Sequence, residues 1–166
     1  MRRNAIRRLV VKYKVELMFL GEFTHSIDEK GRLIIPAKFR PELADGAVVT
    51  RGFEKYLLVY PLNTFKRLAL RAKSLSPTDP ENRALLRLTF SGASEAALDK
   101  QGRINIPPFL RAYGDINDDC VIVGVGDYIE VWNKAAWEEQ LKILNDPEAN
   151  AQRFAALNLA LVPTDE

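Results

Sequence analysis

The sequence has very little of the residue types from which metal centres and most hydrolytic active sites are built. Of its 166 residues, one is a cysteine, Cys120, and one is a histidine, His25. A single cysteine cannot form an internal disulfide, so a reducing, cytoplasmic setting is expected. One histidine and one cysteine are too few for a zinc site of those ligands, and no nucleophile-elbow motif accompanies His25. We therefore expect no metal, no cofactor and no enzymatic activity, with Cys120 in "CVIVGV" a small buried hydrophobe.

Three other features are missing. No apolar run approaches the roughly 20 residues that cross a bilayer, and the opening "MRRNAIRRLVVKYKVEL" lacks the apolar core and cleavage site of a secretory signal. No GxxxxGK[ST] loop occurs, and "GVGDYI" has two of the three glycines of a dinucleotide loop and leads into strand-like residues. These absences argue against a membrane partner and against nucleotide binding.

The chain has no net positive charge outside its N-terminus. The net charge is +2, but residues 1–17 carry +5, so the rest of the chain is −3. A mildly acidic body offers no general attraction for nucleic acid, and any such binding must come from a local basic cluster. Met1 and Met18 are the only methionines. We interpret residues 1–17 as a basic, disordered extension, either a tail preceding a translation start at Met18 or a mobile basic arm.

The sequence contains an internal repeat. Residues 28–40 read "DEKGRLIIPAKFR" and residues 99–111 read "DKQGRINIPPFLR". The similarity continues from "GFEKYLLVY" (52–60) to "GVGDYIEVW" (124–132), and from "DPEN" (79–82) to "DPEA" (146–149). Two copies are too few for a solenoid. They predict a pseudo-twofold unit in which each half completes the core of the other.

Each half predicts the same series of elements. A glycine turn between two extended runs indicates a hairpin. Leu33 and Ile35 alternate with Arg32 and Ile34, a period of two, and in the second copy Ile104 and Ile106 alternate with the polar Arg103 and Asn105. Prolines 36 and 107 end these strands, and a second hairpin follows. Two helices then close each half, with expected N-caps at Asn63 and Asn133 for the first helix and Asp-Pro-Glu starts at residues 79 and 146 for the second. The fold class expected is therefore α+β.

The duplicated polar residues are the candidate site. Asp28 and Asp99 are expected to hold the glycine turns at Gly31 and Gly102 through backbone bonds. Arg32 and Arg103 lie on the non-core phase of their strands, and guanidinium groups bind phosphates and guanine edges bidentately. An exposed hairpin can enter a DNA groove. The residues alone leave two readings open, a DNA-binding face and a solvated charged rim.

The doubled D-x-x-G-R-[LI]-x-[IL]-P phrase resembles the MraZ family of bacterial transcriptional regulators, and each half resembles the AbrB/SpoVT-type swapped-hairpin DNA-binding domain. The likeness covers Met18 to about residue 160. It implies two repeats, 18–90 and 91–166, that form a pseudo-twofold swapped-hairpin β-barrel. It also implies a sequence-specific repressor of the division and cell-wall gene cluster. Such a repressor binds tandem repeats upstream of its own operon as a homo-oligomeric ring, in the cytoplasm at the nucleoid.

Carried over position by position, the resemblance implies that Arg32 and Arg103 contact DNA, with Lys30 at the usual basic position of the first motif. The second copy departs there with Gln101, and it has Asn105 where the first has Ile34. The helpers expected around them are Lys38, Arg40 and Arg111, some of them merely structural. Trp137 and Phe154 are candidate anchors between subunits, or else part of the chain's own core. The alternative function is a non-DNA-binding oligomeric scaffold whose arginines form ion pairs at the rim.

Overall fold

The structure is a computed structural model and describes residues 18–157, so the interpretation of residues 1–17 lies outside the described residues. The described elements of the first half are β1 (Glu22–Ser26), β2 (Arg32–Ile34), the 3-10 helix η1 (Ala37–Leu43), β3 (Ala47–Arg51), β4 (Tyr56–Pro61), α2 (Leu62–Ala72) and α3 (Pro80–Ser91). Those of the second half are β5 (Ser94–Ala96), β6 (Arg103–Asn105), α4 (Pro108–Gly114), β7 (Asp119–Gly124), β8 (Ile129–Asn133), α5 (Lys134–Leu144) and α6 (Pro147–Arg153). The predicted order of elements is thus repeated, and the fold is α+β.

The two halves exchange strands within one antiparallel sheet. Its six strands are ordered β1-β7-β8-β4-β3-β5, which is symmetric about the contact between β8 and β4. The first strand of the chain therefore pairs with the second half, with Phe23 opposite Ile122. In return, β5 of the second half pairs with β3 of the first, with Ala96 opposite Ala47. Each half completes the sheet of the other, as the duplication predicts.

The sheet does not close into the barrel that the resemblance implied. Its hydrogen-bonded order has two edges, at β1 and β5, and β2 pairs with β6 in a separate two-stranded ribbon. Each ribbon strand has three residues. The reason is local: Pro36 and Pro107 lack the N–H that would continue the ladder, and each is followed directly by a helical turn, η1 or α4. Neither of these short helices was predicted from the sequence.

The core lies between the sheet and the ribbon and draws on both halves. Leu33, Ile35 and Ile106 are fully buried, and 1% of the surface of Ile104 is exposed. This burial confirms the predicted alternation. These residues pack in one cluster with residues of both repeats, including Val49, Leu57, Ile122 and Val131. Cys120 is fully buried in the same cluster, as expected. A second, smaller cluster consists of Val121, Trp132 and Trp137 of the second half, with Tyr56 of the first half packed against it.

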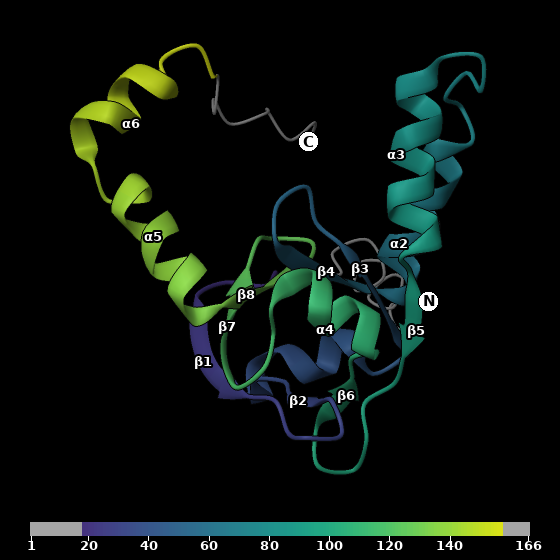
Figure 1. The fold of residues 1–166 in the computed structure, drawn as a ribbon, viewed down its shortest axis with the longest axis vertical. Helices are drawn as coiled ribbons and strands as arrows, with labels where there is room; N and C mark the ends of the chain where they lie inside the picture. The colour runs from purple at the N-terminus through teal and green to yellow at the C-terminus, as the bar shows by residue number, and fades with distance from the viewer. Residues whose placement is uncertain (1–17, 158–166) are drawn as a thin grey trace, which may run out of the picture.

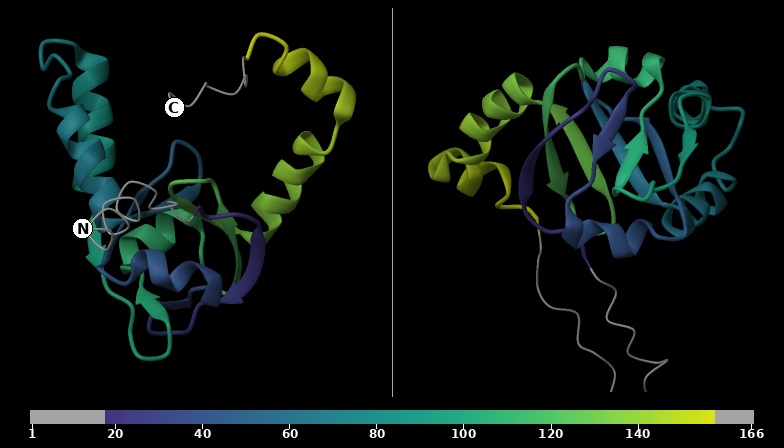
Figure 2. Two further views of the ribbon diagram at one scale, coloured as in Figure 1. Left: turned by 180° about the vertical axis from the view of Figure 1, so that it is seen from behind. Right: turned by 90° about the horizontal axis from the view of Figure 1, so that it is seen from below.

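Two helical arms extend from the sheet on the side away from the ribbon, α2 with α3 and α5 with α6 (Figures 1 and 2). Three of the four predicted N-caps are confirmed: the side chains of Asn133, Asp79 and Asp146 each accept hydrogen bonds from backbone N–H groups of the first helical turn. The cap predicted at Asn63 is wrong. The N-cap residue of α2 is Pro61, two residues earlier, and the helix begins at Leu62 because Pro61 already supplies the extended residue before it.

The glycine turns are points of close contact between the two halves. Gly31 has φ of +81°, and a Cβ there would lie 2.8 Å from the carbonyl oxygen of Ile106 in the other half. The Ile106 N–H donates to the Gly31 carbonyl at 2.7 Å, and the Ile35 N–H donates to the Gly102 carbonyl at 2.9 Å. Since these turns need both a positive φ and a bare Cα, glycine is required twice over.

Replacing Gly31 by alanine should therefore destabilise the protein more than the same change at Gly126. Gly126 has a similar φ of +76° but nothing within 4 Å of its ideal Cβ position. Gly126→Ala should cost about 1–2 kcal/mol for the backbone conformation alone. Gly31→Ala should cost at least about 1 kcal/mol more, because the Ile106 hydrogen bond is lost as well. Urea unfolding followed by tryptophan fluorescence measures both, and equal losses would contradict the close contact.

Candidate nucleic-acid interface

The β2–β6 ribbon forms the end of the molecule opposite the helical arms (Figure 1). Its inner residues Leu33 and Ile104 face each other across the ribbon and are buried. Because strand residues alternate in direction, Arg32, Ile34, Arg103 and Asn105 lie on the outer face. The two arginines predicted from the repeated motif are thus brought together on one surface, one from each half.

Each arginine is held by the aspartate that precedes it by four residues. One carboxylate oxygen of Asp28, Oδ1, accepts the backbone N–H groups of Lys30 at 3.0 Å and Arg32 at 2.9 Å, and the other, Oδ2, accepts Arg32 Nε at 2.7 Å. Asp99 repeats the arrangement on Gln101 and Arg103, with the backbone bonds at 2.9 Å and the Nε bond at 2.7 Å. The expected turn-structuring role of both aspartates is what these contacts describe.

These bonds keep both carboxylates charged. The backbone N–H of Arg32 is the largest cause that lowers the pKa of Asp28, followed among the lowering causes by the Arg32 side chain, and Arg103 does the same to Asp99. Each bond uses the Nε of a guanidinium, which has five N–H donors in all. On Arg103 the terminal amino groups make two further contacts, because Nη2 donates to Gln101 Oε1 at 3.4 Å and Nη1 lies 3.8 Å from Asp28 Oδ2. Both contacts are long, so these groups can still turn to other acceptors. An ion pair of this kind orients a cation without consuming all of its donors.

Arg40 and Arg111, the other duplicated pair, are placed differently. Arg40 Nε donates to the carbonyl of Ile35 at 2.9 Å, and Arg111 Nε donates to that of Ile106 at 3.1 Å. Each guanidinium also covers the turn of the opposite half, because a Cβ at Gly102 would overlap Arg40 and one at Gly31 would lie 2.9 Å from Arg111 Nε. Each of these two residues links the end of its own strand to the glycine turn of the opposite half. This is a structural role, as was expected for some of the residues around Arg32 and Arg103.

The remaining predicted residues are exposed at the same end. Lys30, Lys38 and Gln101 are exposed, and Lys38 lies over the ring of Phe23, 5.8 Å from its centroid. The side chains of Arg32 and Arg103 are 35% and 23% exposed. Two residues were not among the predicted site residues, Lys100 at the tip of the second hairpin and Asn105 on the ribbon. Lys100 stands where the first copy has Glu29, so comparing the copies position by position would have found it.

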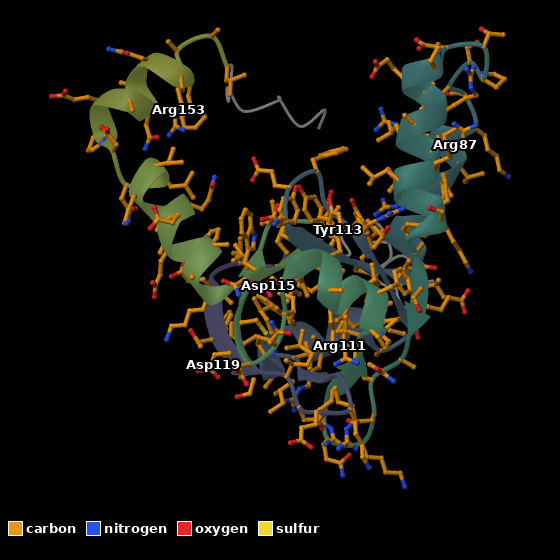
Figure 3. The ribbon with its side chains drawn as sticks, in the orientation of Figure 1. Arg87, Arg111, Tyr113, Asp115, Asp119 and Arg153 are labelled. Atoms are coloured by element: carbon orange, nitrogen blue, oxygen red, sulfur yellow. The ribbon has the colours of Figure 1, made fainter. Side chains whose placement is uncertain are left out.

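The charge of the ribbon end contrasts with that of the whole chain. Each repeated motif, 28–40 and 99–111, carries +2, whereas residues 18–166 together carry −3, so residues outside the motifs sum to −7. Among the residues that the structure describes, the stretch 62–91, which includes α2 and α3, is also basic and carries +4. Figure 3 shows that Arg87 of this second stretch lies on the far arm, whereas Arg111 lies toward the ribbon. Residues 18–157 therefore have two separate basic surfaces, at opposite ends.

Residues 18–157 offer little support for metal binding, for a reactive thiol or for a membrane span. No group of three or more His, Cys, Asp or Glu side chains there is placed to hold a metal ion. Burial raises the pKa of the Cys120 thiol to about 12, which leaves it protonated and unreactive. Burial, followed by the charge of Arg40, lowers the pKa of His25. No helix in this part of the chain has the length and apolar character to span a membrane.

The fold and the site define a class of protein: two exchanged α+β repeats that share one core and present a duplicated, aspartate-held pair of arginines on a β-ribbon. The family model described as "MraZ protein, putative antitoxin-like" matches the chain twice, at residues 18–88 and 89–158. The chain belongs to the MraZ family.

The relatives carry one name, "Transcriptional regulator MraZ". The protein of Herpetosiphon aurantiacus is 50% identical over 143 residues, which cover 86% of this chain and all of that protein. That of Thermomicrobium roseum is 44% identical over 141 residues, 84% of this chain and 99% of its own. That of Desulfitobacterium hafniense is 46% identical over 134 residues, 81% of this chain and 94% of its own. The family is thus one of transcriptional regulators and not of enzymes.

Arg40 and Arg32 should differ sharply in their effect on stability. Arg40→Ala removes a charged donor from the Ile35 carbonyl and exposes the turn at Gly102, and it should cost about 1–3 kcal/mol. Arg32→Ala removes one half-exposed ion pair and should cost less. Urea unfolding of the two variants measures the difference. A loss for Arg32→Ala that matches or exceeds that for Arg40→Ala would show that both arginines are structural.

Proposed function

We propose that the protein is a sequence-specific DNA-binding repressor whose reading surface is the outer face of the β2–β6 ribbon. The observation that carries the proposal is the duplicated arrangement of Arg32 on Asp28 and Arg103 on Asp99, each with an Nε bond of 2.7 Å. A two-stranded antiparallel ribbon fits the major groove of B-DNA. An arginine whose rotamer is already fixed loses less conformational freedom when it binds a base or a phosphate.

In this mechanism the aspartates do not touch DNA. They fix the guanidinium planes and the turns, and the Nη groups of Arg32 and Arg103 take base edges or phosphates. Lys30, Lys38 and Lys100 reach phosphates at the edges of the groove, and Gln101 contacts a base edge or a phosphate. Arg40 and Arg111 act indirectly, by holding the two hairpins together. Membership of the MraZ family supports a finer proposal, that the targets are tandem repeats upstream of its own division and cell-wall operon, at the cytoplasmic nucleoid.

The DNA surface is tested by removing single cations and measuring binding across salt concentrations. Arg32→Ala and Arg103→Ala should each weaken binding to a duplex from the protein's own upstream region by about 1–3 kcal/mol, or about 5- to 150-fold. Loss of a phosphate contact also reduces the slope of log affinity against log salt by about 0.9. Fluorescence anisotropy with native and scrambled duplexes measures both quantities.

Arg87→Ala is the matched control, because it removes the same charge from the second basic surface on α3. It should leave the affinity unchanged. Weaker binding for Arg87→Ala than for either ribbon variant would move the DNA surface to the α2–α3 arm. Binding of native duplex no tighter than scrambled duplex, by a folded wild type, would contradict the repressor.

The alternative is a scaffold that does not bind DNA, and the same ion pairs favour it, because Asp28 and Asp99 already give both arginines a structural partner. The two readings differ in one respect. A scaffold keeps all its interactions in Arg32→Ala, whereas a repressor loses its operator. The Asp–Arg arrangement occurs twice on the basic β2–β6 ribbon, and this duplication supports the interpretation as a DNA-binding repressor.

We also propose that copies of the chain assemble through their helical arms into a ring. Of the two predicted anchors, Trp137 belongs to the chain's own fold: it is 7% exposed, packs with Trp132, and donates from Nε1 to Glu22 at 3.1 Å. Phe154 is different, because 47% of it is exposed at the end of α6. Ile143 and Leu144 on α5 are exposed by 48% and 38%.

The opposite arm offers a matching surface. A groove of about 430 Å³ lies between the sheet, α2 and α3, with Leu68, Leu75, Leu85 and Phe90 among its lining residues and Arg71 beside them. Residues 62–91 carry +4, whereas residues 134–157, which include α5 and α6, carry −1. Apolar surface and charge thus complement each other between different arms. A contact of that kind runs head to tail and closes into a ring when the rotation allows it.

A ring would raise the affinity for repeated DNA sites, since one copy supplies few cations and linked copies bind with avidity. Phe154→Ser and Leu85→Ser should each reduce the mass of the assembly measured by light scattering, without lowering the melting temperature by more than a few degrees. The control is Leu70→Ser, a residue of α2 that is 64% exposed and does not line the groove. An unchanged assembly mass in both variants would place the contact elsewhere.

A further inference from the structure

Two pairs of aromatic rings lie on the outer face of the sheet, where β4 meets β8. Tyr56 is opposite Trp132, and their rings stack with centroids 4.7 Å apart. Further along the same two strands, the rings of Tyr60 and Tyr128 lie 5.3 Å apart. Because strand residues alternate in direction, these side chains point away from the shared core. They lie on the side of the sheet from which the two helical arms extend (Figure 1).

A carboxylate stands between the two aromatic pairs. Glu130 lies opposite Leu58 in the register, midway between the two pairs along the strands. Two residues of a strand span about 7 Å, so both pairs of rings are within reach of a ligand bound above Glu130. The Oε2 atom of Glu130 accepts the Trp132 Nε1–H at 2.7 Å. Within residues 18–157 no ion pair involves Glu130, so this part of the chain supplies no counter-ion for it.

We call Tyr56, Tyr60, Tyr128, Trp132 and Glu130 the aromatic box. Burial is the largest cause that raises the pKa of Glu130, and the charge of Glu54 raises it further, whereas the indole hydrogen bond lowers it. Burial, followed by the charge of Glu130, raises the pKa of both Tyr56 and Tyr128. Burial, the other two tyrosines and Glu130 raise the pKa of Tyr60 to about 12. The oxygen atoms of the box therefore lie close enough together to disfavour negative charge and to favour a cation among them.

Aromatic rings around a carboxylate suit an alkylammonium ion. Ring faces attract an organic cation that lies within about 6 Å of their centroids. An ammonium N–H also makes a strong, charge-assisted hydrogen bond to a carboxylate. A divalent metal ion fits less well, because it takes about six or more oxygen ligands. Within residues 18–157 no group of three or more His, Cys, Asp or Glu side chains is placed to hold one.

The rim of the same face adds two carboxylates. Glu54 lies in the turn between β3 and β4, Asp127 lies in the turn between β7 and β8, and both are exposed. The charge of Asp127 adds to the effects of burial and of Glu130 on the pKa of Tyr128, which places it near the box as Glu54 is. Lys55, next to Glu54, is exposed as well. A flexible ligand with several ammonium groups can therefore engage the box and its rim together.

We propose that the aromatic box binds a linear polyamine, with one terminal ammonium group on Glu130 between the rings and the others toward Glu54 and Asp127. The inference goes beyond the proposed DNA binding, because the box and the β2–β6 ribbon lie on opposite sides of the sheet. The site suits a small free ligand more than a folded partner. The arms flank it, since α2 follows β4 directly and α5 follows β8 directly. Its floor is recessed, with Leu58 and Trp132 exposed by 8% and 6%.

The tryptophans of the chain report on this site. Trp132 and Trp137 are the only two, and their rings lie 5.6 Å apart. Spermidine is titrated into the full-length protein at fixed ionic strength, with tryptophan fluorescence and isothermal titration calorimetry as readouts and magnesium chloride as the control cation. We expect a saturable change in fluorescence and in heat with spermidine, and no saturable change with magnesium.

Variants of the box test which groups bind the amine. Glu130→Gln keeps an amide oxygen for the Trp132 indole and removes the charge. It should weaken spermidine binding by about 10- to 150-fold, the range for a hydrogen bond to a charged group. Tyr60→Leu removes one ring face and should weaken binding by about 2- to 30-fold. Glu95→Gln is the matched control, because it removes the same charge from an exposed residue of β5 at the sheet edge, and it should leave the affinity unchanged.

Thermal unfolding shows which variants are folded, and if Glu130→Gln is not, Tyr60→Leu and Glu95→Gln decide the question. No saturable binding of spermidine by the folded wild type overturns the inference, as does an equal affinity for magnesium. Equal weakening in Glu95→Gln and a box variant shows a diffuse attraction to negative charge and also overturns it. Binding to a Phe154→Ser protein but not to the wild type shows that a neighbouring copy covers the box, which overturns a site for a free amine. These results are separate from DNA binding by the ribbon.

Discussion

Two hydrogen bonds tie the fold together at the point where the site is made. The Ile106 N–H donates to the Gly31 carbonyl, and the Ile35 N–H donates to the Gly102 carbonyl, so each turn is closed by the strand of the other half. Glycine is needed at both turns for the approach of the chain. The buried residues on either side of these bonds belong to one cluster, so the two hairpins pack on a shared core. The same hydrogen bond, from a strand N–H of one half to the glycine carbonyl of the other, is made at both turns, and it joins the ribbon to the shared core.

The same contact sorts the duplicated arginines into two kinds. Arg40 and Arg111 each donate from Nε to a strand carbonyl, and each covers the glycine turn of the opposite half. They therefore help to hold the two hairpins together. Arg32 and Arg103 instead donate from Nε to an aspartate at the surface, and the Nη groups of Arg103 make longer contacts with Gln101 and Asp28, at 3.4 and 3.8 Å. The two pairs of duplicated arginines therefore have different structural roles. A rigid turn behind an oriented cation is what a reader of DNA needs, since the geometry exists before the ligand arrives.

Much of this could be predicted from the residues, because duplication and alternation are local signals. The repeat, the buried phase of Leu33 and Ile35, the aspartate turns and three N-caps follow from spacing alone. The open sheet was not predicted. The prolines that end β2 and β6 were recognised in the sequence, but the helical turns η1 and α4 directly after them were not, and these turns leave β2 and β6 in a separate ribbon. The separation of Arg40 from Arg32 was hidden as well. Both are exposed-phase arginines in the sequence, and only the packing on Gly102 shows that Arg40 turns inward.

The central claim is that Arg32 and Arg103 meet DNA while Arg40 and Arg111 hold the hairpins. The most direct measurement is nuclear magnetic resonance of the arginine Nε–H groups, in a Phe154→Ser protein of single-chain size, as the duplex from its own upstream region is added. The account predicts shifts at Arg32 and Arg103, with the Nε–H of Arg40 and Arg111 unchanged and still protected from exchange with water. Shifts confined to the arginines of α2 and α3, with the ribbon arginines unmoved, would contradict it.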